Sequence, residues 1–396
     1  MGGRAVTIVV CNAGGSLLGS LGPFEVVTPW WQDVEPIGRR FPALSVVRLL
    51  HGTPADRGAV GGQVTYLAEG DPGLALSPAA GLAGPGALAD HPLRMPWARP
   101  GGPAADLGWA ADAALAAGLK IAGSPVQHRT WNLSCIWSIP VRQSSGSEAR
   151  LWLKCVPGFF AHEAVVLRGL SGQAVPRLVA AQRHRLLLAE LPGRDGYDAT
   201  EDEAKQIIEC LVALQLRTVP LVPALLAGGV PEARQETFIQ ELQDVVARRA
   251  PHDPVLRRLA EEAGARLAQA EACGLPDVLV HGDAHPGNAR IGGSTPILFD
   301  WGDARIGNPL LDLAVLSRLP GPAGQALAAH WLRTWKQAVP GSDPERAWQL
   351  LRPLAALRLA AVYQHFLDNI EPSERVYHDQ DVQPALQAAA RLAATT

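Results

Sequence analysis

A polar loop that directly follows an apolar strand constrains the fold of this chain more than any other feature. Residues 278–280 are Val-Leu-Val and predict a short buried strand. Residues 288–291 and 297–300 predict two further short strands, joined across a Gly-Gly-Ser-Thr-Pro turn. A strand, a loop and a hairpin in this order bring the polar side chains of the loop to the open end of the hairpin.

Three oxygen-bearing side chains occupy this part of the sequence. If the hairpin pairs symmetrically, Asn288 and Asp300 face each other at its open end, and Asp283 lies on the loop that leads into the same end. Two carboxylates and an amide at one place suit Mg²⁺, a hard cation that takes oxygen ligands and keeps several waters for contacts with phosphates. The alternative is a solvated turn that happens to be rich in Asp and His.

The stretch that begins at His281 resembles the catalytic loop and metal-binding segment of the aminoglycoside phosphotransferase and choline kinase family, which are small-molecule relatives of protein kinases. The family pattern is H-G-D-x-H-x-x-N, a hydrophobic-D-W or D-F segment and G-x-P-x-x-D-L-A, and every position is filled here. The resemblance implies that Asp283 is the catalytic base, that Asn288 and Asp300 hold Mg²⁺, and that His281 and Asp312 support the loop. The spacing of the Asp and the Asn is also that of the protein-kinase catalytic loop.

The two histidines of this loop leave a second metal chemistry open. His281, Asp283 and His285 form an H-x-D-x-H pattern, and imidazole and carboxylate groups also suit zinc. Pro286 and Gly287 follow directly, and the sequence offers no cluster of other His or Cys residues that would complete a tetrahedral set. The resemblance instead makes His281 a structural residue that fixes the loop by hydrogen bonding.

Lysine is rare in this chain, which makes its position in an apolar strand informative. The sequence holds four lysines against 31 arginines, and Lys154 lies in the strand predicted at residues 149–156. Period-two alternation puts Lys154 on one face with Trp152 and Val156. A compact ammonium can face phosphates where a wide guanidinium would not fit the same slot. The alternative is a lysine that extends into solvent at a sheet edge.

The resemblance also implies partners for this lysine. A helix is predicted from residue 160 to 170 with Glu163 on its first turn, and in protein kinases a glutamate of the helix after the lysine strand orients the lysine toward nucleotide phosphates. Glu163 as a surface residue is the alternative. Upstream, residues 128–141 predict two strands around a turn that, unlike the kinase pattern, contains no glycine. There Ser134 and backbone N–H groups would cover the phosphates.

A further apolar strand, predicted at residues 185–191, stops at a Pro-Gly pair. Relatives in the family have a similar strand, at whose end the backbone meets the adenine. The resemblance therefore implies that Glu190 and Leu191 form the hinge between two lobes and contact the nucleotide through their backbone. Because side chains take no part in such contacts, the sequence does not distinguish ATP from GTP.

Composition limits the classes of partner. The chain of 396 residues is 47% apolar and 18% charged with a net charge of −3, which gives no support to nucleic acid or an anionic membrane as partner. Five scattered cysteines without a C-x-x-C pair indicate reduced thiols. The first apolar run is too short for a signal-peptide core, and no stretch approaches the roughly 18 to 20 apolar residues of a membrane span. We therefore expect a soluble, cytoplasmic protein.

These patterns together predict an α+β chain with a bilobal, protein-kinase-like fold that follows a small α+β N-terminal domain of unknown role. The predicted boundaries are 1–95 for the N-terminal domain, 96–120 for a Gly/Pro/Ala-rich tether with a short helix, 121–193 for a small lobe with an antiparallel sheet, and 194–396 for a mainly helical large lobe that carries the catalytic hairpin. In the N-terminal domain, strands are predicted at 5–11, 44–50 and 63–68 and a helix within 30–40. In the large lobe, helices are predicted at 200–217, 233–249, 254–272, 324–339 and 344–365.

The predicted function is transfer of the γ-phosphoryl group of a nucleoside triphosphate, ATP or GTP, to a hydroxyl of a small molecule with the help of Mg²⁺. The acceptor remains open among aminoglycosides, amino alcohols and sugars, because acceptor contacts follow no short motif. A nucleotide-binding regulatory pseudokinase without turnover is the alternative, motivated by the glycine-free turn and the additional N-terminal residues. A zinc hydrolase based on the two loop histidines is a third choice.

Overall fold

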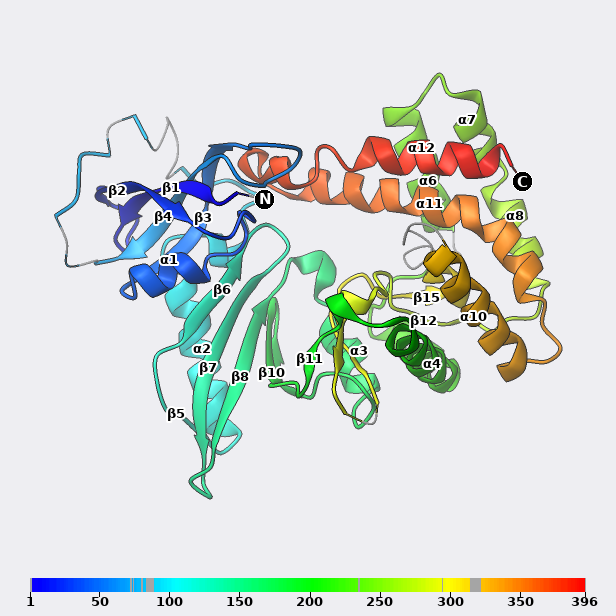
Figure 1. Ribbon diagram of the computed structural model, residues 1–396, viewed down its shortest axis with the longest axis horizontal. Coiled ribbons are helices and arrows are strands. Elements are labelled where there is room, and N and C mark those ends of the chain that lie inside the picture. Colours follow the sequence, from blue (N-terminus) through cyan, green and yellow to red (C-terminus); the bar gives the residue numbers. More distant parts are fainter. Residues whose placement is uncertain are drawn as a thin grey trace. The chain divides into compact units, whose positions relative to one another are not determined.

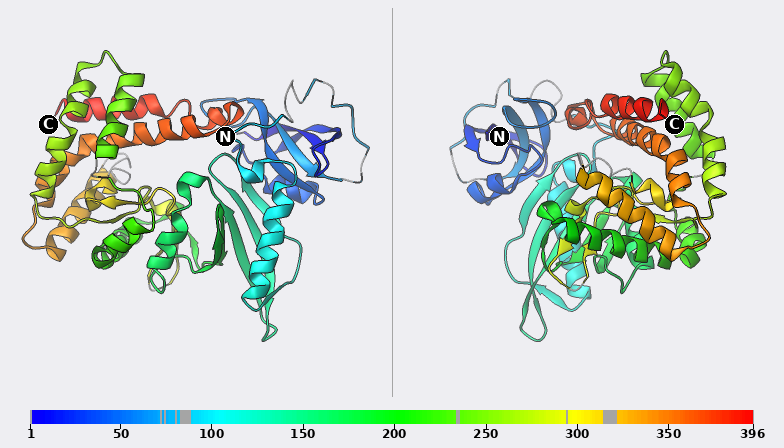
Figure 2. Two further views of the ribbon diagram at one scale, coloured as in Figure 1. Left: turned by 180° about the vertical axis from the view of Figure 1, so that it is seen from behind. Right: turned by 45° about the vertical axis from the view of Figure 1, so that its right-hand side comes forward.

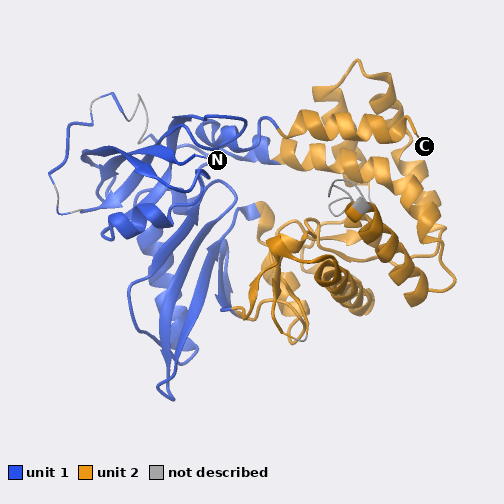
Figure 3. Ribbon diagram, viewed as in Figure 1, with its two compact units in different colours: residues 1–158, 179–190, 366–380 blue, residues 159–178, 191–365, 381–396 orange. Residues whose placement is uncertain are grey.

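The computed structural model describes residues 2–71, 73, 75–79, 81–82, 89–233, 236–293, 295–313 and 322–395. The chain divides into two compact units, each made of several segments (Figure 3). Unit 1 comprises residues 1–158, 179–190 and 366–380, and unit 2 comprises residues 159–178, 191–365 and 381–396. The residues predicted as an N-terminal domain thus fall in the same compact unit as the strand that carries Lys154.

Unit 1 contains two sheets (Figure 1). The first has the order β2-β1-β4-β3, with β1 and β4 parallel and the other pairs antiparallel. The second has the order β5-β7-β8-β10-β9, and β6 also pairs with β7. The elements, with 3₁₀ helices labelled η, are β1 (Arg4–Cys11), β2 (Leu17–Val26), α1 (Glu35–Arg40), β3 (Leu44–Thr53), β4 (Gln63–Gly70), η1 (Pro96–Ala98), α2 (Gly102–Ala116), β5 (Leu119–Ile121), β6 (Val126–Thr130), β7 (Cys135–Gln143), β8 (Glu148–Cys155), β9 (Leu178–Gln182), β10 (Arg185–Ala189) and η7 (Pro372–Tyr377).

The strands predicted near the N-terminus are confirmed as β1, β3 and β4, because alternating apolar residues there fill one core. The predicted helix is shorter, since α1 begins only at Glu35. Strand β2 was not predicted. It contains Gly19 and Gly22, both at positive φ, and Pro23, and residues of these types normally indicate turns rather than strands.

Helix α2 covers one face of the second sheet (Figure 2). Its buried Asp106 accepts hydrogen bonds from Arg185 Nε at 2.6 Å, from His184 Nε2 at 3.1 Å and from Cys155 Sγ at 3.3 Å. Burial opposes ionisation of Asp106, but the bonds and charges of His184 and Arg185 prevail and lower its pKa. An ionised carboxylate therefore fastens the helix to strands β8 and β10.

The stretch before α2 does not behave as the free tether that its composition predicted. Trp97 is buried, and its indole N–H donates to the carbonyl oxygen of Trp131 at 3.1 Å. Arg94 forms a buried ion pair with Glu371 at 2.9 Å. The glycines and prolines around Trp97 indicated a linker. In the structure, the side chains of Trp97 and Arg94 anchor this stretch in the core of unit 1.

Residues 366–380, which we call the C-terminal segment, add a buried carboxyl group to unit 1. Burial, and next the charge of Glu371, raises the pKa of Glu374 to about 8, although Arg48 and two backbone N–H groups oppose this rise. Glu374 is thus predominantly protonated near neutral pH. The protonation state of Glu374 thus differs from that of Asp106, whose partners keep its carboxylate ionised.

The Glu374→Gln substitution should make stability less dependent on pH. The folded chain binds the Glu374 proton more tightly than the unfolded chain, so the free energy of unfolding falls as pH rises from about 4.5 to about 8. Gln resembles the protonated carboxyl and does not titrate, so the variant should have the shallower slope and should equal or exceed the native protein in stability near the upper limit. Urea unfolding between about pH 5 and about pH 9 measures this, and equal slopes would contradict it.

Unit 2 is mainly helical and carries two small sheets, β11-β13-β14 and β12-β15 (Figure 1). The large-lobe helices predicted from sequence are confirmed within a few residues, with the predicted helix 254–272 divided into α7 and α8. The elements are η2 (Gly158–Phe160), α3 (Glu163–Gly169), β11 (Arg194–Asp195), η3 (Gly196–Asp198), α4 (Glu201–Thr218), η4 (Val219–Leu221), α5 (Val222–Ala227), α6 (Glu236–Arg249), α7 (Pro254–Glu261), α8 (Ala263–Glu271), β12 (Val278–Val280), η5 (Pro286–Asn288), β13 (Ala289–Ile291), β14 (Ile297–Leu298), β15 (Arg305–Gly307), η6 (Pro309–Leu311), α10 (Pro322–Ala338), α11 (Pro344–Asn369) and α12 (Val382–Ala393).

One helical stretch of unit 2, Glu201–Ala227, is long and apolar enough to cross a membrane. The stretch is not a continuous apolar run of the kind that the sequence analysis excluded, because Glu209 and Arg217 interrupt it. Length and composition do not distinguish a membrane span from a core helix, and the contacts of this stretch are polar as well as apolar. Gln215 donates to Asp312 at 2.8 Å, and Thr218 accepts from the backbone N–H of Leu279 at 2.9 Å. These bonds tie α4 to strand β12 and to Asp312.

Candidate active site

Strand β12 leads into the candidate site, as the sequence predicted. All three of its residues are buried, and it pairs antiparallel with β15. The loop that follows turns sharply at Gly282, which has a φ of 91°. A Cβ atom at Gly282 would lie 2.2 Å from the carbonyl oxygen of Asp303, so only glycine allows these two backbones to approach so closely.

A buried carboxylate holds the start of the loop. Asp312 accepts hydrogen bonds from the backbone N–H of His281 at 2.8 Å, from that of Gly282 at 2.7 Å and from the side chain of Gln215 at 2.8 Å. Burial raises the pKa of Asp312 to about 6, although the two backbone donors favour the ionised form. Asp312 is thus an acceptor for three donors, which is the supporting role that the sequence analysis gave it.

His281 is oriented by bonds on both sides of its ring. Nε2 lies 3.0 Å from the carbonyl oxygen of Phe299, and the N–H of Asp283 donates to Nδ1 at 3.4 Å. Burial lowers the pKa of His281, so the ring is neutral and carries its proton on Nε2. The ring also packs against Trp301, with the centroids 4.4 Å apart. Both nitrogens are engaged by the loop, which disfavours the zinc alternative.

The residues that the structure describes do contain one group of side chains close enough to share a metal ion, but it is elsewhere. Asp106, Cys155 and His184 place their ligand atoms within 4.8 Å of one another. Their bonds to one another and to Arg185 already account for them as the ion-pair network beneath α2. Neither this group nor the loop histidines supports a zinc hydrolase.

Asp283 and Asn288 are joined by hydrogen bonds. The amide nitrogen of Asn288 donates to the carbonyl oxygen of Asp283 at 2.9 Å and to its carboxylate at 3.0 Å, and His285 Nε2 lies 3.5 Å from the same carboxylate. Burial opposes ionisation of Asp283, but the hydrogen bond and charge of His285, with the Asn288 amide, lower its pKa. The side chain of Asp283 is 44% exposed. It is therefore an ionised carboxylate that a ligand can reach.

The predicted hairpin forms, with a pairing one residue away from the symmetric one. Ala289 pairs with Leu298, and the N–H of Phe299 donates to the carbonyl oxygen of Asn288 at 3.0 Å. Asn288 thus faces Phe299 rather than Asp300. Asp300 is exposed and adopts a φ of 65°, the left-handed region that a non-glycine residue rarely occupies. The chain turns at Asp300 instead of continuing the strand, and such strain is common at functional sites.

The structure adds two residues to this site that the sequence analysis missed. Burial, and next the charge of Asp283, raises the pKa of Asp303 to about 7, and Asp300 contributes in the same direction. Arg358 of α11 is buried and donates to the carbonyl oxygens of Gly282 at 3.4 Å and Asp303 at 3.3 Å. Three carboxylates are therefore close enough to influence one another, and a buried cation lies behind them. Asp303 lies only three residues after Asp300, so the sequence could have suggested it. No local pattern in the sequence pointed to Arg358.

Glu163 is buried at the first position of α3 rather than exposed on a helix surface. Its carboxylate accepts a hydrogen bond from the backbone N–H of Trp301 at 3.3 Å, so it contacts the segment that carries Asp300. The helix itself is shorter than predicted, because residues 158–160 form a separate 3₁₀ turn. The surface alternative for Glu163 was wrong.

The other predicted nucleotide residues lie mainly in unit 1. Lys154 is partly buried in β8, where it pairs with Ile136 of β7 and Leu186 of β10. Because β8 lies between two other strands, the alternative of a lysine at a sheet edge was wrong. Ser134 is buried in the turn between β6 and β7, and its hydroxyl accepts from the Trp131 indole at 3.0 Å.

The predicted hinge residues coincide with a division of the chain. Glu190 ends one segment of unit 1, and Leu191 begins the next segment of unit 2. The side chain of Glu190 is about half exposed and bonds Arg150 at 2.8 Å. The backbone N–H of Glu190 donates to the carbonyl oxygen of Arg150 at 3.2 Å. The nucleotide contact expected of these two residues stays a prediction.

Comparison with known proteins places the chain in a family. The profile described as "Phosphotransferase enzyme family" matches residues 157–354, half of the chain. No curated protein sequence matches the chain significantly. Among solved structures, a candidate aminoglycoside phosphotransferase of Ralstonia eutropha has 16% identity and a TM-score of 0.53, with 73% of this chain and 98% of that chain covered.

Two further solved structures have similar coverage. A candidate fructosamine-3-kinase of Thermobifida fusca has 19% identity and a TM-score of 0.50, and a macrolide 2′-phosphotransferase of Brachybacterium faecium has 18% identity and a TM-score of 0.48; each alignment covers 72% of this chain and 98% of the other. At these identities the likeness concerns the fold, a mixed α+β architecture. The family match includes the whole of the loop and hairpin described above. The chain belongs to the phosphotransferase enzyme family.

Proposed function

We propose that this protein transfers the γ-phosphoryl group of ATP, with Mg²⁺, to a hydroxyl group of a small molecule, and that it has the bilobal arrangement of protein kinases. The observation that carries the proposal is the joined pair of Asp283 and Asn288 beside Asp300. An ionised, reachable carboxylate is held by an amide five residues later in the chain. We further propose that the enzyme acts in the cytoplasm, without nucleic acid or membrane as partner, in keeping with its net charge of −3.

The residues of the hairpin fit a magnesium ion. Asn288 uses its amide nitrogen on Asp283, which leaves the amide oxygen as the group that can act as a ligand. Asp300 is exposed, and the charges of Asp283 and Asp300 both raise the pKa of Asp303. Excess negative charge on oxygen ligands is the environment that a hard divalent cation prefers. A bound Mg²⁺ would neutralise the charge of the transferred phosphoryl group and its leaving group.

In the proposed reaction, Asp283 accepts the proton of the acceptor hydroxyl as its oxygen bonds to the γ-phosphorus, while the bond from that phosphorus to the bridging oxygen breaks and ADP leaves. His281 and Asn288 keep the loop and the carboxylate in place, since each bonds Asp283 directly. Lys154 supplies positive charge to the nucleotide phosphates, and Glu163 supports its orientation. Glu190 and Leu191 would hold the adenine through their backbone. Positioning and electrostatics dominate such transfers, so most of these residues act without changing their own bonds.

Tyr197 would contact an acceptor molecule near Asp283. Its side chain is 73% exposed, and its ring lies 6.1 Å from that of His285, the neighbour of Asp283. An exposed aromatic ring with Asp198 beside it in the chain suits an amino sugar or another cationic acceptor, whereas Asp195 is already paired with Arg290 at 2.6 Å. This observation favours aminoglycoside-like and amino alcohol acceptors over neutral sugars.

The Asp300→Ala substitution should weaken Mg²⁺-dependent nucleotide binding by about tenfold or more, because a metal site loses one of its anionic ligands. Titration calorimetry with ATP, in the presence and absence of Mg²⁺, measures this effect. The matched control is Asp202→Ala, since Asp202 is 91% exposed on α4. Equal affinities for the variant and the native protein in Mg²⁺ would remove Asp300 from the metal site.

Nucleotide turnover tests the proposed function itself. The native protein would be supplied with Mg²⁺ and ATP, and then GTP, together with pools of aminoglycosides, amino alcohols and small sugars. Acceptor-dependent turnover that disappears in the Asp283→Ala variant is the expected result. Tight nucleotide binding without turnover in any pool would instead favour a regulatory pseudokinase.

A further inference from the structure

The turn between β6 and β7 is held in place by hydrogen bonds and by burial. Residues 131–134 contain no glycine, and the backbone N–H of Trp131 donates to the carbonyl oxygen of Ser134 at 3.0 Å. The Trp131 indole donates to the Ser134 hydroxyl, also at 3.0 Å. Asn132 and Ser134 are both buried. The turn is thus closed by its own bonds and covered by other parts of unit 1.

The C-terminal segment makes the most specific of these contacts. Asn132 Nδ2 lies 2.9 Å from Nε2 of His378, about 250 residues later in the chain. Trp131 packs against Tyr377 and His378, with ring centroids 5.4 Å and 5.5 Å apart. The carboxyl of Glu374 accepts a hydrogen bond from the backbone N–H of Asn132. Three side chains of one short segment therefore hold two consecutive residues of the turn.

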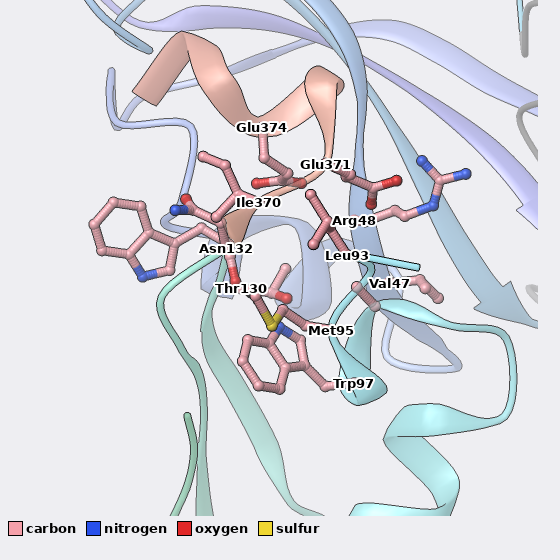
Figure 4. A pocket seen from close by; sticks show the side chains of 12 residues that line it. Val47, Arg48, Leu93, Met95, Trp97, Thr130, Asn132, Ile370, Glu371 and Glu374 are labelled. Carbon is pink, nitrogen blue, oxygen red and sulfur yellow. Dashed lines mark hydrogen bonds between the residues drawn. The ribbon is translucent and has the colours of Figure 1, made fainter. Parts of the chain in front are cut away.

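Other parts of unit 1 complete this arrangement. The Trp97 indole donates to the carbonyl oxygen of Trp131 at 3.1 Å, and the buried pair of Arg94 and Glu371 fixes the start of the segment. Side chains of the turn and of the segment line one cavity (Figure 4). Within the described residues, Thr130 Oγ1, Asn132 Oδ1 and Glu374 Oε2 are buried there without a hydrogen-bond partner. The contact between the turn and the C-terminal segment is therefore polar as well as aromatic.

We infer that His378 is a positioning residue for nucleotide binding, because it holds Asn132 and thereby the turn that would cover the phosphates. This inference rests on the proposed function and on the family resemblance, which implies that the turn covers the phosphates in place of a glycine-rich loop. A glycine-rich loop is mobile and loses conformational freedom when it closes on a ligand. A turn that is already held by packing avoids most of that cost, which preserves affinity without glycine. In this chain, the C-terminal segment would thus support nucleotide binding by holding the turn in place, whereas a glycine-rich loop closes on the phosphates because it is flexible.

Nucleotide binding by full-length variants tests this inference. The His378→Ala variant should bind Mg²⁺-ATP about three- to tenfold more weakly than the native protein, because one buried hydrogen bond and a ring contact are lost. His378→Gln should recover most of the affinity, since an amide can again bond Asn132. His252→Ala is the matched control, because His252 is exposed in unit 2. Titration calorimetry gives the affinities.

Hydrogen exchange and a second variant make the test specific. Amide exchange in residues 126–143 should become faster in His378→Ala and return toward the native rate in His378→Gln, while exchange in α6 stays unchanged. Asn132→Ala should weaken binding to a similar degree, and the double variant Asn132→Ala with His378→Ala should add little further loss. If His378→Ala fails to fold, Asn132→Ala tests the expected loss of affinity, and His378→Gln is the variant expected to keep it.

The outcomes separate this inference from the proposed function. Native protein that binds no nucleotide at all would overturn the proposed function and with it the inference. Native binding together with unchanged affinity and unchanged exchange in His378→Ala and Asn132→Ala would overturn the inference alone. Additive losses in the double variant would also overturn it, because they would mean that the two residues act independently.

Discussion

Replacing Asp283 by Asn is expected to lower the rate of phosphoryl transfer by about 10²- to 10⁴-fold and to leave nucleotide affinity nearly unchanged. The amide has the shape of the carboxylate, so the bond to Asn288 and the course of the loop can be kept. It cannot accept the proton of the acceptor hydroxyl, and the transfer loses its base. The lowered pKa of Asp283 makes this contrast large, because the native group is ionised near neutral pH.

Steady-state turnover measures the rate of phosphoryl transfer, and titration calorimetry measures the nucleotide affinity. The Asp202→Asn variant is the matched control, since it makes the same chemical change at an exposed position of α4. Turnover by Asp283→Asn within a few-fold of the native rate would remove Asp283 from the role of base. A large loss of nucleotide affinity would instead assign Asp283 to the binding of the metal ion.

The Asp312→Ala substitution should lower the free energy of unfolding by at least about 3 kcal/mol. Asp312 is fully buried and accepts from His281, Gly282 and Gln215, so its removal leaves three N–H groups without their acceptor. Each unpaired buried donor costs about 1 to 3 kcal/mol. The loop that carries Asp283 begins at two of these donors, so activity should fall together with stability.

Urea unfolding followed by circular dichroism measures the loss. Asp312→Asn should lie between the native protein and Asp312→Ala, because its oxygen keeps some of the bonds while its NH₂ group faces a donor. The Asp202→Ala variant, which removes an exposed carboxylate, should differ from the native protein by less than about 0.5 kcal/mol. An Asp312→Ala protein as stable as that control would mean that water replaces the lost acceptor and that Asp312 does not anchor the loop.

Local spacing was sufficient to predict much of the site. Residues 278–300 follow one another closely, so the strand, the loop and the hairpin could be derived from short-range patterns, and Asp283 lies on the loop between the strand and the hairpin as expected. The register of the hairpin was wrong by one residue. Pairing depends on how the chain leaves the strand, and the left-handed conformation of Asp300 cannot be recognised from an aspartate in sequence.

Burial corrected several interpretations that sequence left open. Lys154 lies in an interior strand and Glu163 is covered, although each could have been a surface residue by composition alone. The stretch before α2 is anchored by Trp97, although its glycines and prolines suggested a tether. In each case the deciding factor is what packs against the residue, and the residues that do so come from elsewhere in the chain.

The sequence by itself determined the order of strand, loop and hairpin and brought Asp283 close to Asn288, because these residues are near neighbours in the chain. Only the tertiary structure decided what holds that loop and the turn at residues 131–134. Arg358 reaches Gly282 from a helix far along the chain, and His378 reaches Asn132 across an even longer separation. Contacts between such distant residues depend on the packing of whole elements, which leaves no periodic or local pattern in the sequence to be read.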